Sequence, residues 1–368
     1  MWTANVRSVH SPSSAAALAV ALLSLASRVE AATCDGTGIL EPPLRADEQL
    51  IVAMSPASGY ERTTLYQVPD SAPPSDRKLV ILLHGGGETN REDQLSDMRA
   101  TGWMQIAESD GVVIAYPTAM QDPDDPDSRL NWNDGRLGTD IWAMPDHANI
   151  DDAGYISEVM DYAQQNLGVG GRIYVLGISN GGMMSLRLST DPRTQHRIQR
   201  MVTMVAQIPT DRWTQPIGAV PLMMIAGTAD PLMPFTGGDI LIQAESEDGT
   251  PLGDPTYASS VVSFNQTLKR FINVNGCAPT PTTRNFPDVD HDGIRVREMD
   301  YCLPSRTVRA YLVVNGGHRW PGVGDNSPDW TRACYVTDSG FHYYVTAGPT
   351  TLDGFRATNV AWQYFSAP

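Results

Sequence analysis

The stretch RIYVLGISNGG at residues 172–182 decides the fold, because it joins an apolar run to a serine set between glycines. A short apolar run without alternation is typical of a strand buried on both faces of a parallel sheet. Gly177 and Gly181 stand two residues before and after Ser179, and this spacing allows a sharp turn from a strand into a helix. We therefore predict that Ser179 projects from such a turn as a nucleophile. The alternative is a glycine-rich turn whose serine only caps the helix.

Further strands and helices alternate on both sides of this stretch. Unbroken apolar runs predict buried strands at residues 79–83, 111–117, 200–206, 220–226 and 308–314. Helices are predicted at 152–166, 257–273 and 352–365, and another carries Met98, Trp103, Ile106 and Ala107. Residues 50–69 predict antiparallel strands at the sheet edge, and residues 118–148 a long loop. The alternation predicts an α/β fold with a mostly parallel central sheet flanked by helices.

A glycine-rich turn, His84-Gly85-Gly86-Gly87, follows the first of these buried strands. Acyl transfer develops negative charge on an oxygen, which needs backbone N–H donors aimed at it. We expect one donor from Gly86 or a neighbour and the other from Asn180, directly after the serine. The alternative is a phosphate-binding or purely structural turn. His84 itself is interpreted as structural.

One histidine and one aspartate follow predicted strands at the edge where ligand and catalytic groups gather in open α/β sheets. His318 follows the last of these strands through a Gly-Gly turn, and Asp230 follows the strand at 220–226. We predict that His318 is a general base and that Asp230 holds its tautomer. The order Ser179, Asp230, His318 is that of α/β-hydrolases. The alternatives are a loop histidine packed beside Trp320 and a loop aspartate that caps the next turn.

Composition and the N-terminal segment limit the class of protein. The chain has 368 residues, of which 41% are hydrophobic and 18% charged, as in a globular protein with a sizeable core. Arg7, an apolar run at 15–25 and small residues up to Ala31 predict a signal peptide at 1–31. Residues 32–368 then form one catalytic domain. The alternative is an uncleaved membrane anchor.

The net charge of the chain is −16. It becomes −17 without residues 1–31, because that segment carries two arginines and one glutamate. Such an acidic chain argues against nucleic acid and anionic membranes as partners. We expect a secreted or periplasmic protein.

Four cysteines, Cys34, Cys277, Cys302 and Cys334, remain in the predicted mature chain. An even number in an exported protein predicts two disulfides, and three pairings are open. A β-hairpin is expected between Cys277 and Cys302, which favours that pair and leaves Cys34 with Cys334. Four free thiols are the alternative.

No metal or organic cofactor is expected. The chain contains no Cys-x-x-Cys motif. Asp288, Asp290, Asp292 and Gly293 resemble the first half of a calcium loop, but Met299 stands where its last carboxylate belongs. We interpret this segment as an Asp-rich hairpin turn.

Several blocks of the sequence resemble the secreted α/β-hydrolases that include polyhydroxybutyrate depolymerase-like and feruloyl esterase-like enzymes. They are LLHGGGETN at 82–90, DDAGYI at 151–156, GISNGGMMS at 177–185, GTADPLMPFTGG at 227–238 and GGHRWPG at 316–322. The resemblance implies the triad Ser179, Asp230 and His318, and a disulfide between Cys277 and Cys302. It also implies a serine esterase that acts through an acyl-enzyme on hydroxyalkanoate oligomers, or on feruloyl or acetyl esters of plant polysaccharide. The alternatives are a serine peptidase of the same fold and a non-catalytic binding protein.

Two features depart from the pattern of these relatives. Arg319 directly follows the candidate histidine, where the family has a small hydroxyl residue, and residues 239–255 form an acidic insertion. Arg319 would place a cation near the mouth of the site. Trp132 and Trp320 are candidates to line an aromatic subsite, with core packing as an equal alternative for each.

Overall fold

The computed structural model describes most of the chain after residue 43. The described residues are 44–71, 73, 75–87, 99–121, 129–136, 150–210, 215–246, 248–289, 291–302, 307–323, 332–336, 342–348 and 355–367. The predicted signal peptide, Cys34 and the side chain of Cys334 lie outside this part of the chain, and so does the predicted pairing of these two cysteines.

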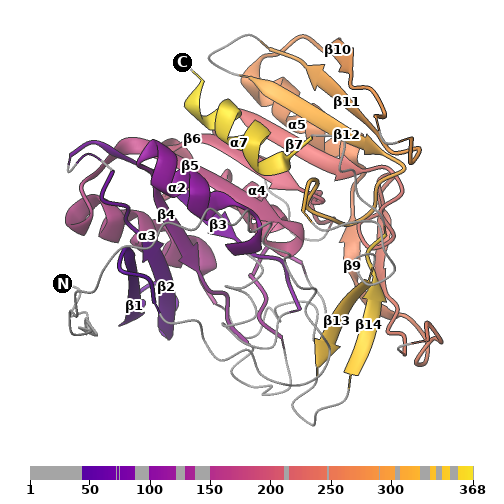
Figure 1. Cartoon of the computed structure of the whole chain (residues 1–368), viewed down its shortest axis with the longest axis horizontal. Coiled ribbons are helices and arrows are strands. Elements are labelled where there is room, and N and C mark those ends of the chain that lie inside the picture. Colours follow the sequence, from indigo (N-terminus) through magenta and orange to yellow (C-terminus); the bar gives the residue numbers. More distant parts are fainter. Residues whose placement is uncertain are drawn as a thin grey trace, which may run out of the picture.

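A large twisted sheet forms the centre of the molecule (Figure 1). Within the described residues it has ten strands in the order β1-β2-β4-β3-β5-β6-β7-β12-β11-β10. The central strands are parallel: β4 (Val113–Pro117), β3 (Arg77–Leu83), β5 (Val169–Ile178), β6 (Ile198–Met204), β7 (Leu222–Gly227) and β12 (Val308–Val314). Antiparallel strands extend both ends: β1 (Glu48–Met54) with β2 (Glu61–Gln67), and β11 (Arg295–Asp300) with β10 (Thr282–Asn285). The predicted mostly parallel α/β sheet is confirmed.

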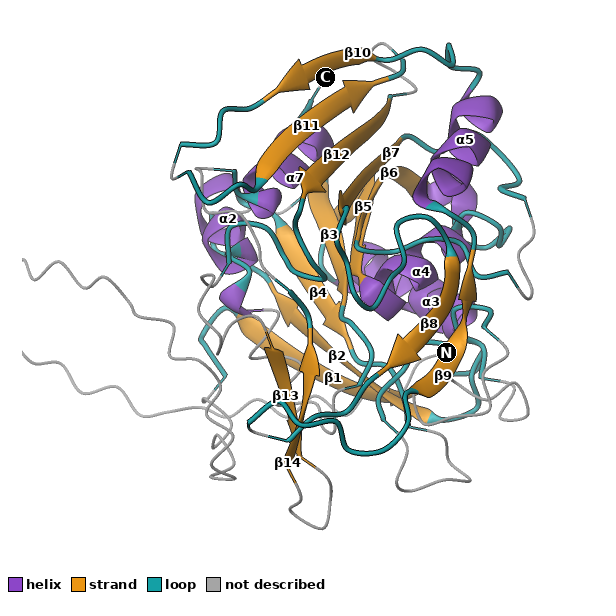
Figure 2. Cartoon of the chain, turned by 90° about the vertical axis from the view of Figure 1, so that its right-hand side faces the viewer, coloured by secondary structure: helices purple, strands orange, loops and turns teal. Residues whose placement is uncertain are grey.

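Helices cover both faces of the sheet (Figures 1 and 2). On one face lie α2 (Trp103–Asp110) and α7 (Ala357–Ser366), and on the other α3 (Asp152–Asn166), α4 (Ser179–Leu188) and α5 (Phe264–Asn275). A hydrophobic core lies between the sheet and the helices on each face. Along β3, Leu79, Ile81 and Leu83 belong to the core on the side of α3, α4 and α5, whereas Val80 and Leu82 belong to the core on the side of α2 and α7. This two-sided burial explains why β3 is apolar without alternation.

Helix α3 has the predicted bounds, and its cap has a simple chemical cause. The side chain of Asp151 accepts a hydrogen bond from the backbone N–H of Gly154 at 2.9 Å, which satisfies one of the free donors at the helix start.

The predicted helix at 257–273 is wrong over residues 257–263, about its first two turns. Residues Thr256–Val261 form strand β9, which pairs with β8 (Gly238–Ile242) inside the acidic insertion. Helix α5 begins only at Phe264, because Ser263 and Gln266 form a capping box there. The closing helix also begins later than predicted, at Ala357 rather than 352. In the parts that the structure describes, strands β13 (Arg332–Val336) and β14 (His342–Thr346) form a further antiparallel pair.

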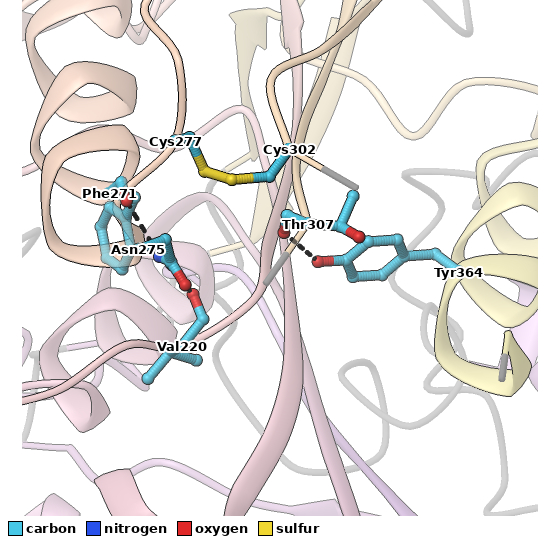
Figure 3. Close-up of a disulfide and its surroundings, with 7 residues drawn as sticks. All are labelled: Val220, Phe271, Asn275, Cys277, Cys302, Thr307 and Tyr364. Carbon is cyan, nitrogen blue, oxygen red and sulfur yellow. Dashed lines mark hydrogen bonds between the residues drawn. A yellow bond between two sulfur atoms is a disulfide. The ribbon is translucent and has the colours of Figure 1, made fainter. Parts of the chain in front are cut away.

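The predicted hairpin between Cys277 and Cys302 is present as β10 and β11, and the two cysteines form a disulfide (Figure 3). Around it, the side-chain amide of Asn275 donates to the carbonyl oxygens of Val220 and Phe271 at 3.0 and 2.9 Å. The bridge therefore fastens the end of α5 to the end of β11, and the Asn275 hydrogen bond to Val220 fastens it to the start of β7. No described helix combines the length and the apolar character needed to cross a membrane.

Candidate active site

Ser179 occupies a strained turn between β5 and α4. Its φ is 53°, in the left-handed region that residues with a side chain rarely adopt. A Cβ on Gly177 would overlap the carbonyl of Gly181, and a Cβ on Gly181 would overlap the carbonyl oxygens of Leu83 and His84. Glycine at both positions is therefore required for this turn, as the sequence spacing indicated.

His318 and Asp230 meet through a direct hydrogen bond. The Nδ1 atom of His318 lies 2.8 Å from Oδ2 of Asp230, and their side chains are 11% and 2% exposed. The other oxygen of Asp230 accepts the backbone N–H groups of Leu232 and Met233 at 2.9 and 2.8 Å. Both carboxylate oxygens thus have partners, which fixes the orientation of the carboxylate toward the imidazole.

The candidate residues share one edge of the sheet. Ser179 follows β5, Asp230 follows β7 and His318 follows β12, in each case at the carboxyl end of a parallel strand. In the strand pairing, Ile178 of β5 lies opposite Met204 of β6, and Met204 lies opposite Ile225 of β7. The last paired residue of β7, Gly227, lies opposite Val313 of β12. The structure therefore joins the histidine to the aspartate and places the serine at the same edge.

The glycine turn after β3 passes directly over the serine. A Cβ built on Gly85 would lie 3.7 Å from the Cβ of Ser179, and one built on Gly86 would lie 3.2 Å from the Cβ of Asn180. Asn180 is the second residue of α4, so its backbone N–H has no acceptor within the helix. The N–H of Gly87, in contrast, donates to the carbonyl of Leu130 at 3.3 Å. Gly86 thus lies against Asn180 beside the serine, which puts the two expected oxyanion donors next to Ser179.

His84 has a structural role in this turn. It is 2% exposed, and its Nε2 accepts the backbone N–H of Ala119 at 3.0 Å. Its Nδ1 must then carry the proton, which it donates to the carbonyl of Gly85. Burial, with a smaller contribution from the nearby Arg62, lowers the pKa of His84 to about 4. The imidazole is therefore neutral and fully engaged, in agreement with the interpretation from sequence.

Comparison with known proteins decides the family. The family model described as phospholipase/carboxylesterase matches residues 69–273, more than half of the chain. The chain belongs to this family. It is a carboxylesterase-type hydrolase of the α/β-hydrolase fold.

The individual proteins that this chain is similar to share little sequence identity with it. The protein named "Putative esterase NocK" from Nocardia uniformis subsp. tsuyamanensis is 27% identical over 269 residues, which are 71% of this chain and 72% of that protein. An acetyl xylan esterase from Aspergillus awamori is 12% identical with a TM-score of 0.46, covering 74% of this chain and 93% of that one. An S-formylglutathione hydrolase from Agrobacterium tumefaciens is 15% identical with a TM-score of 0.35, covering 50% and 76%.

Two tryptophans proposed from sequence to line the substrate site are instead buried in the core of this carboxylesterase. Trp132 is 0% exposed, its ring packs on His84, and its Nε1–H donates to the carbonyl of His84 at 3.1 Å. Trp320 is 7% exposed, and its Nε1–H donates to the hydroxyl of Thr358 in α7. Both indoles thus lie in the hydrophobic core clusters, as the packing alternative expects. Arg319 is half-buried beside His318 and stays a candidate.

At this edge, sequence reasoning anticipated the backbone N–H of Asn180 but not the role of its side chain, nor Asp134 and Val205. The side chain of Asn180 is 2% exposed and hydrogen-bonded to Trp132 and Asp134. Val205 directly follows β6 with a φ of 44°, which is a strained conformation for a β-branched residue. The length of the predicted loop at 118–148 is a sequence signal of function that could have pointed to Asp134. No sequence signal marks the strained backbone of Val205.

Among the described residues, no group of three or more His, Cys, Asp or Glu side chains is arranged to hold a metal ion. Asp290 lies outside the described residues, so the calcium-like motif is seen only in part. Its described members make turn hydrogen bonds: Asp288 Oδ2 accepts the N–H of Gly293, and Asp292 Oδ1 accepts the N–H of Ile294 at 2.7 Å. These contacts belong to a turn that closes the β10–β11 hairpin.

Proposed function

We propose that this carboxylesterase is a serine esterase in which Ser179 is the nucleophile, His318 the general base and Asp230 the residue that orients the imidazole. The observation that carries the proposal is the 2.8 Å hydrogen bond between His318 and Asp230. It fixes the imidazole with Nδ1 as the donor, which leaves Nε2 free to accept a proton. The strained backbone of Ser179 at the same sheet edge supports its role.

The reaction would proceed in two halves. The hydroxyl oxygen of Ser179 attacks the ester carbonyl carbon as His318 Nε2 takes the hydroxyl proton, and the carbonyl oxygen becomes an oxyanion held by the N–H groups of Gly86 and Asn180. The C–O bond to the alcohol then breaks, and His318 gives its proton to the leaving alcohol. Water attacks the acyl-enzyme with His318 again as the base, which releases the acid and restores Ser179.

The proposed substrates are short hydroxyalkanoate oligomers, or feruloyl or acetyl esters of plant polysaccharide. The sequence blocks around the three catalytic residues support this class. Arg319, next to His318 and half-buried, favours an acyl group that carries a polar or acidic substituent. Export through a signal peptide cleaved after Ala31 belongs to the same proposal. N-terminal sequencing of the protein from culture medium or periplasm tests it.

One set of assays tests the function. Wild type and Ser179→Ala are compared on p-nitrophenyl acetate and butyrate, methyl ferulate, hydroxybutyrate oligomers and a peptide panel. The proposal expects ester turnover in the wild type and its loss in Ser179→Ala. Peptide turnover without ester turnover would support a peptidase instead, and full activity in Ser179→Ala would remove the nucleophile assignment.

A further inference from the structure

The side chain of Asn180 is held by hydrogen bonds to one short segment of the chain, residues 129–136. Its Oδ1 accepts the backbone N–H of Trp132 at 2.7 Å, and its Nδ2 donates to the Trp132 carbonyl at 3.0 Å and to Asp134 Oδ2 at 2.6 Å. The amide therefore pairs with the segment much as one strand pairs with another. Because the same residue offers its backbone N–H to the proposed oxyanion, these hydrogen bonds control where that donor points.

The same segment, residues 129–136, also holds the opposite wall of the site. The carbonyl of Leu130 accepts the N–H of Gly87, and the indole N–H of Trp132 donates to the carbonyl of His84. A Cβ on Gly86 would overlap the side-chain oxygen of Asn131. One segment thus touches the glycine turn on one side and the serine turn on the other, and it sets their separation.

Asp134 is the charged anchor of this segment. Its side chain is 2% exposed, and its carboxylate is paired with the Nε of Arg136 at 2.8 Å. The ion pair balances the negative charge, which would otherwise oppose an oxyanion nearby. A carboxylate also makes a shorter and stronger hydrogen bond to an amide donor than a neutral acceptor does. The chemistry of the proposed triad does not use this buried pair.

The segment at 129–136 is also held by contacts of Asn133 with α3 and α4. The N–H of Asn133 donates to Asp152 Oδ2 at 2.7 Å, and Asp152 pairs with the buried Arg62. Arg187 of α4 donates to the side-chain oxygen of Asn133 at 2.6 Å. The segment is therefore tied to the start of α3 and to the helix that carries the serine.

We propose that Asp134 is a positioning residue that acts through the side chain of Asn180 to hold the two oxyanion donors at their working separation. This proposal rests on the proposed function, because it assumes ester hydrolysis at Ser179. It assigns Asp134 an effect on the chemical step rather than on substrate binding, since the oxyanion exists only in the transition state and the intermediate.

The test measures kcat and KM on p-nitrophenyl butyrate for Asp134→Ala, Asp134→Asn, Asn180→Ala and the double variant Asp134→Ala/Asn180→Ala. Asp134→Ala is expected to lower kcat by about 10- to 100-fold with little change in KM, since misplacing one oxyanion donor loses part of its contribution. Asp134→Asn keeps an acceptor oxygen and should recover part of this loss. The affinity for butylboronic acid, which forms a tetrahedral adduct with serine, should fall in parallel with kcat.

The double variant separates positioning from general damage. If Asp134 acts through Asn180, removing it in the Asn180→Ala background should cause little further loss. Asp300→Asn is a matched control, because Asp300 of β11 pairs with Arg309 of β12, outside the described site, and it should leave kcat unchanged.

Two results would overturn the proposal. One is folded Asp134→Ala and Asp134→Asn proteins with kcat within twofold of wild type. The other is a loss of kcat on Asp134→Ala substitution that is as large in the Asn180→Ala background as in the wild type. If Asp134→Ala does not fold, the cycle is run with Asp134→Asn. Ser179→Ala in the same assay distinguishes failure of the positioning role from failure of the proposed function. If Ser179→Ala is inactive and the Asp134 variants are unaffected, only the positioning role of Asp134 is removed. If Ser179→Ala is active, the proposed function is removed.

Discussion

The imidazole of His318 and the carboxylate of Asp230 are held together across two adjacent strands. Their hydrogen bond is 2.8 Å long, while the second oxygen of Asp230 accepts two backbone N–H groups from the turn that follows. Strands β7 and β12 are parallel neighbours, so their ends bring the two residues together although they are 88 positions apart in the sequence. The aspartate is therefore positioned before any substrate arrives.

Asp230→Asn tests what this geometry does for catalysis. The amide can still accept the N–H groups of Leu232 and Met233, so the fold should persist, but it no longer stabilises a charged imidazole. We expect kcat to fall by roughly 100- to 10,000-fold with a small change in KM. Steady-state kinetics on p-nitrophenyl butyrate measure this. Asp239→Asn, an exposed acid on β8, is the control. Activity within tenfold of wild type would argue against the role of Asp230.

Gly181→Ala tests the close packing at the serine turn. Its Cβ would meet the carbonyl oxygens of Leu83 and His84, which are backbone atoms with little room to move. We expect a loss of unfolding free energy of about 1–3 kcal/mol and a strong loss of activity. Gly171→Ala is the control, because beyond Gly171 itself and its two chain neighbours no atom lies within 4 Å of the place that its Cβ would take. Urea denaturation compares the two, and equal stability would contradict the packing argument.

The disulfide gives a prediction about stability alone. Cys277 and Cys302 are 25 residues apart, and closing a loop of this length stabilises a fold by roughly 3 kcal/mol in the chain-entropy model. The double variant Cys277→Ser/Cys302→Ser should lose about this much unfolding free energy in guanidinium denaturation. The bridge joins the end of α5 to the end of β11, away from the carboxyl ends of β5, β7 and β12 that carry the site, so kcat of the folded variant should be retained. A change below about 0.5 kcal/mol would contradict the prediction.

His84 predicts how stability depends on pH. Its pKa is lowered from 6.5 to about 4 by burial, so between these values the unfolded chain binds a proton that the folded chain does not. Stability from this group is therefore complete above pH 6.5 and is lost as the pH falls toward 4. The loss should be on the order of 3 kcal/mol. Denaturation at several pH values measures it. His84→Gln should show a weaker dependence over this range, and an identical dependence would contradict the assignment.

Much of the fold follows from local sequence pattern. The buried strands around residues 79–83 and 308–314 were predicted because both faces of a parallel sheet are covered, which leaves an unbroken apolar run. The boundary at Ser263 was missed, although Ser263 and Gln266 carry the capping-box pattern. The strand at Thr256–Val261 depends on pairing with β8, a contact that a local helical pattern does not reveal.

The candidate site divides in the same way. Ser179, Asp230 and His318 could be named because each follows a strand in a short turn with glycine or small residues. Trp132 could not be placed, because the indole's burial depends on how the loop at 129–136 folds back on His84. Asp134 was missed for the same reason, since its partner Asn180 is 46 residues away in the sequence.

The most direct test of the central claim is to trap Ser179 as a covalent phosphonate adduct, which mimics the tetrahedral intermediate. The wild-type protein and Ser179→Ala are treated with a p-nitrophenyl alkylphosphonate, digested and examined by peptide mass spectrometry. We predict one phosphonylated residue, Ser179, in the wild type, with activity lost in proportion to labelling and no label in Ser179→Ala. Labelling of another residue, or full ester hydrolysis by Ser179→Ala, would contradict the account.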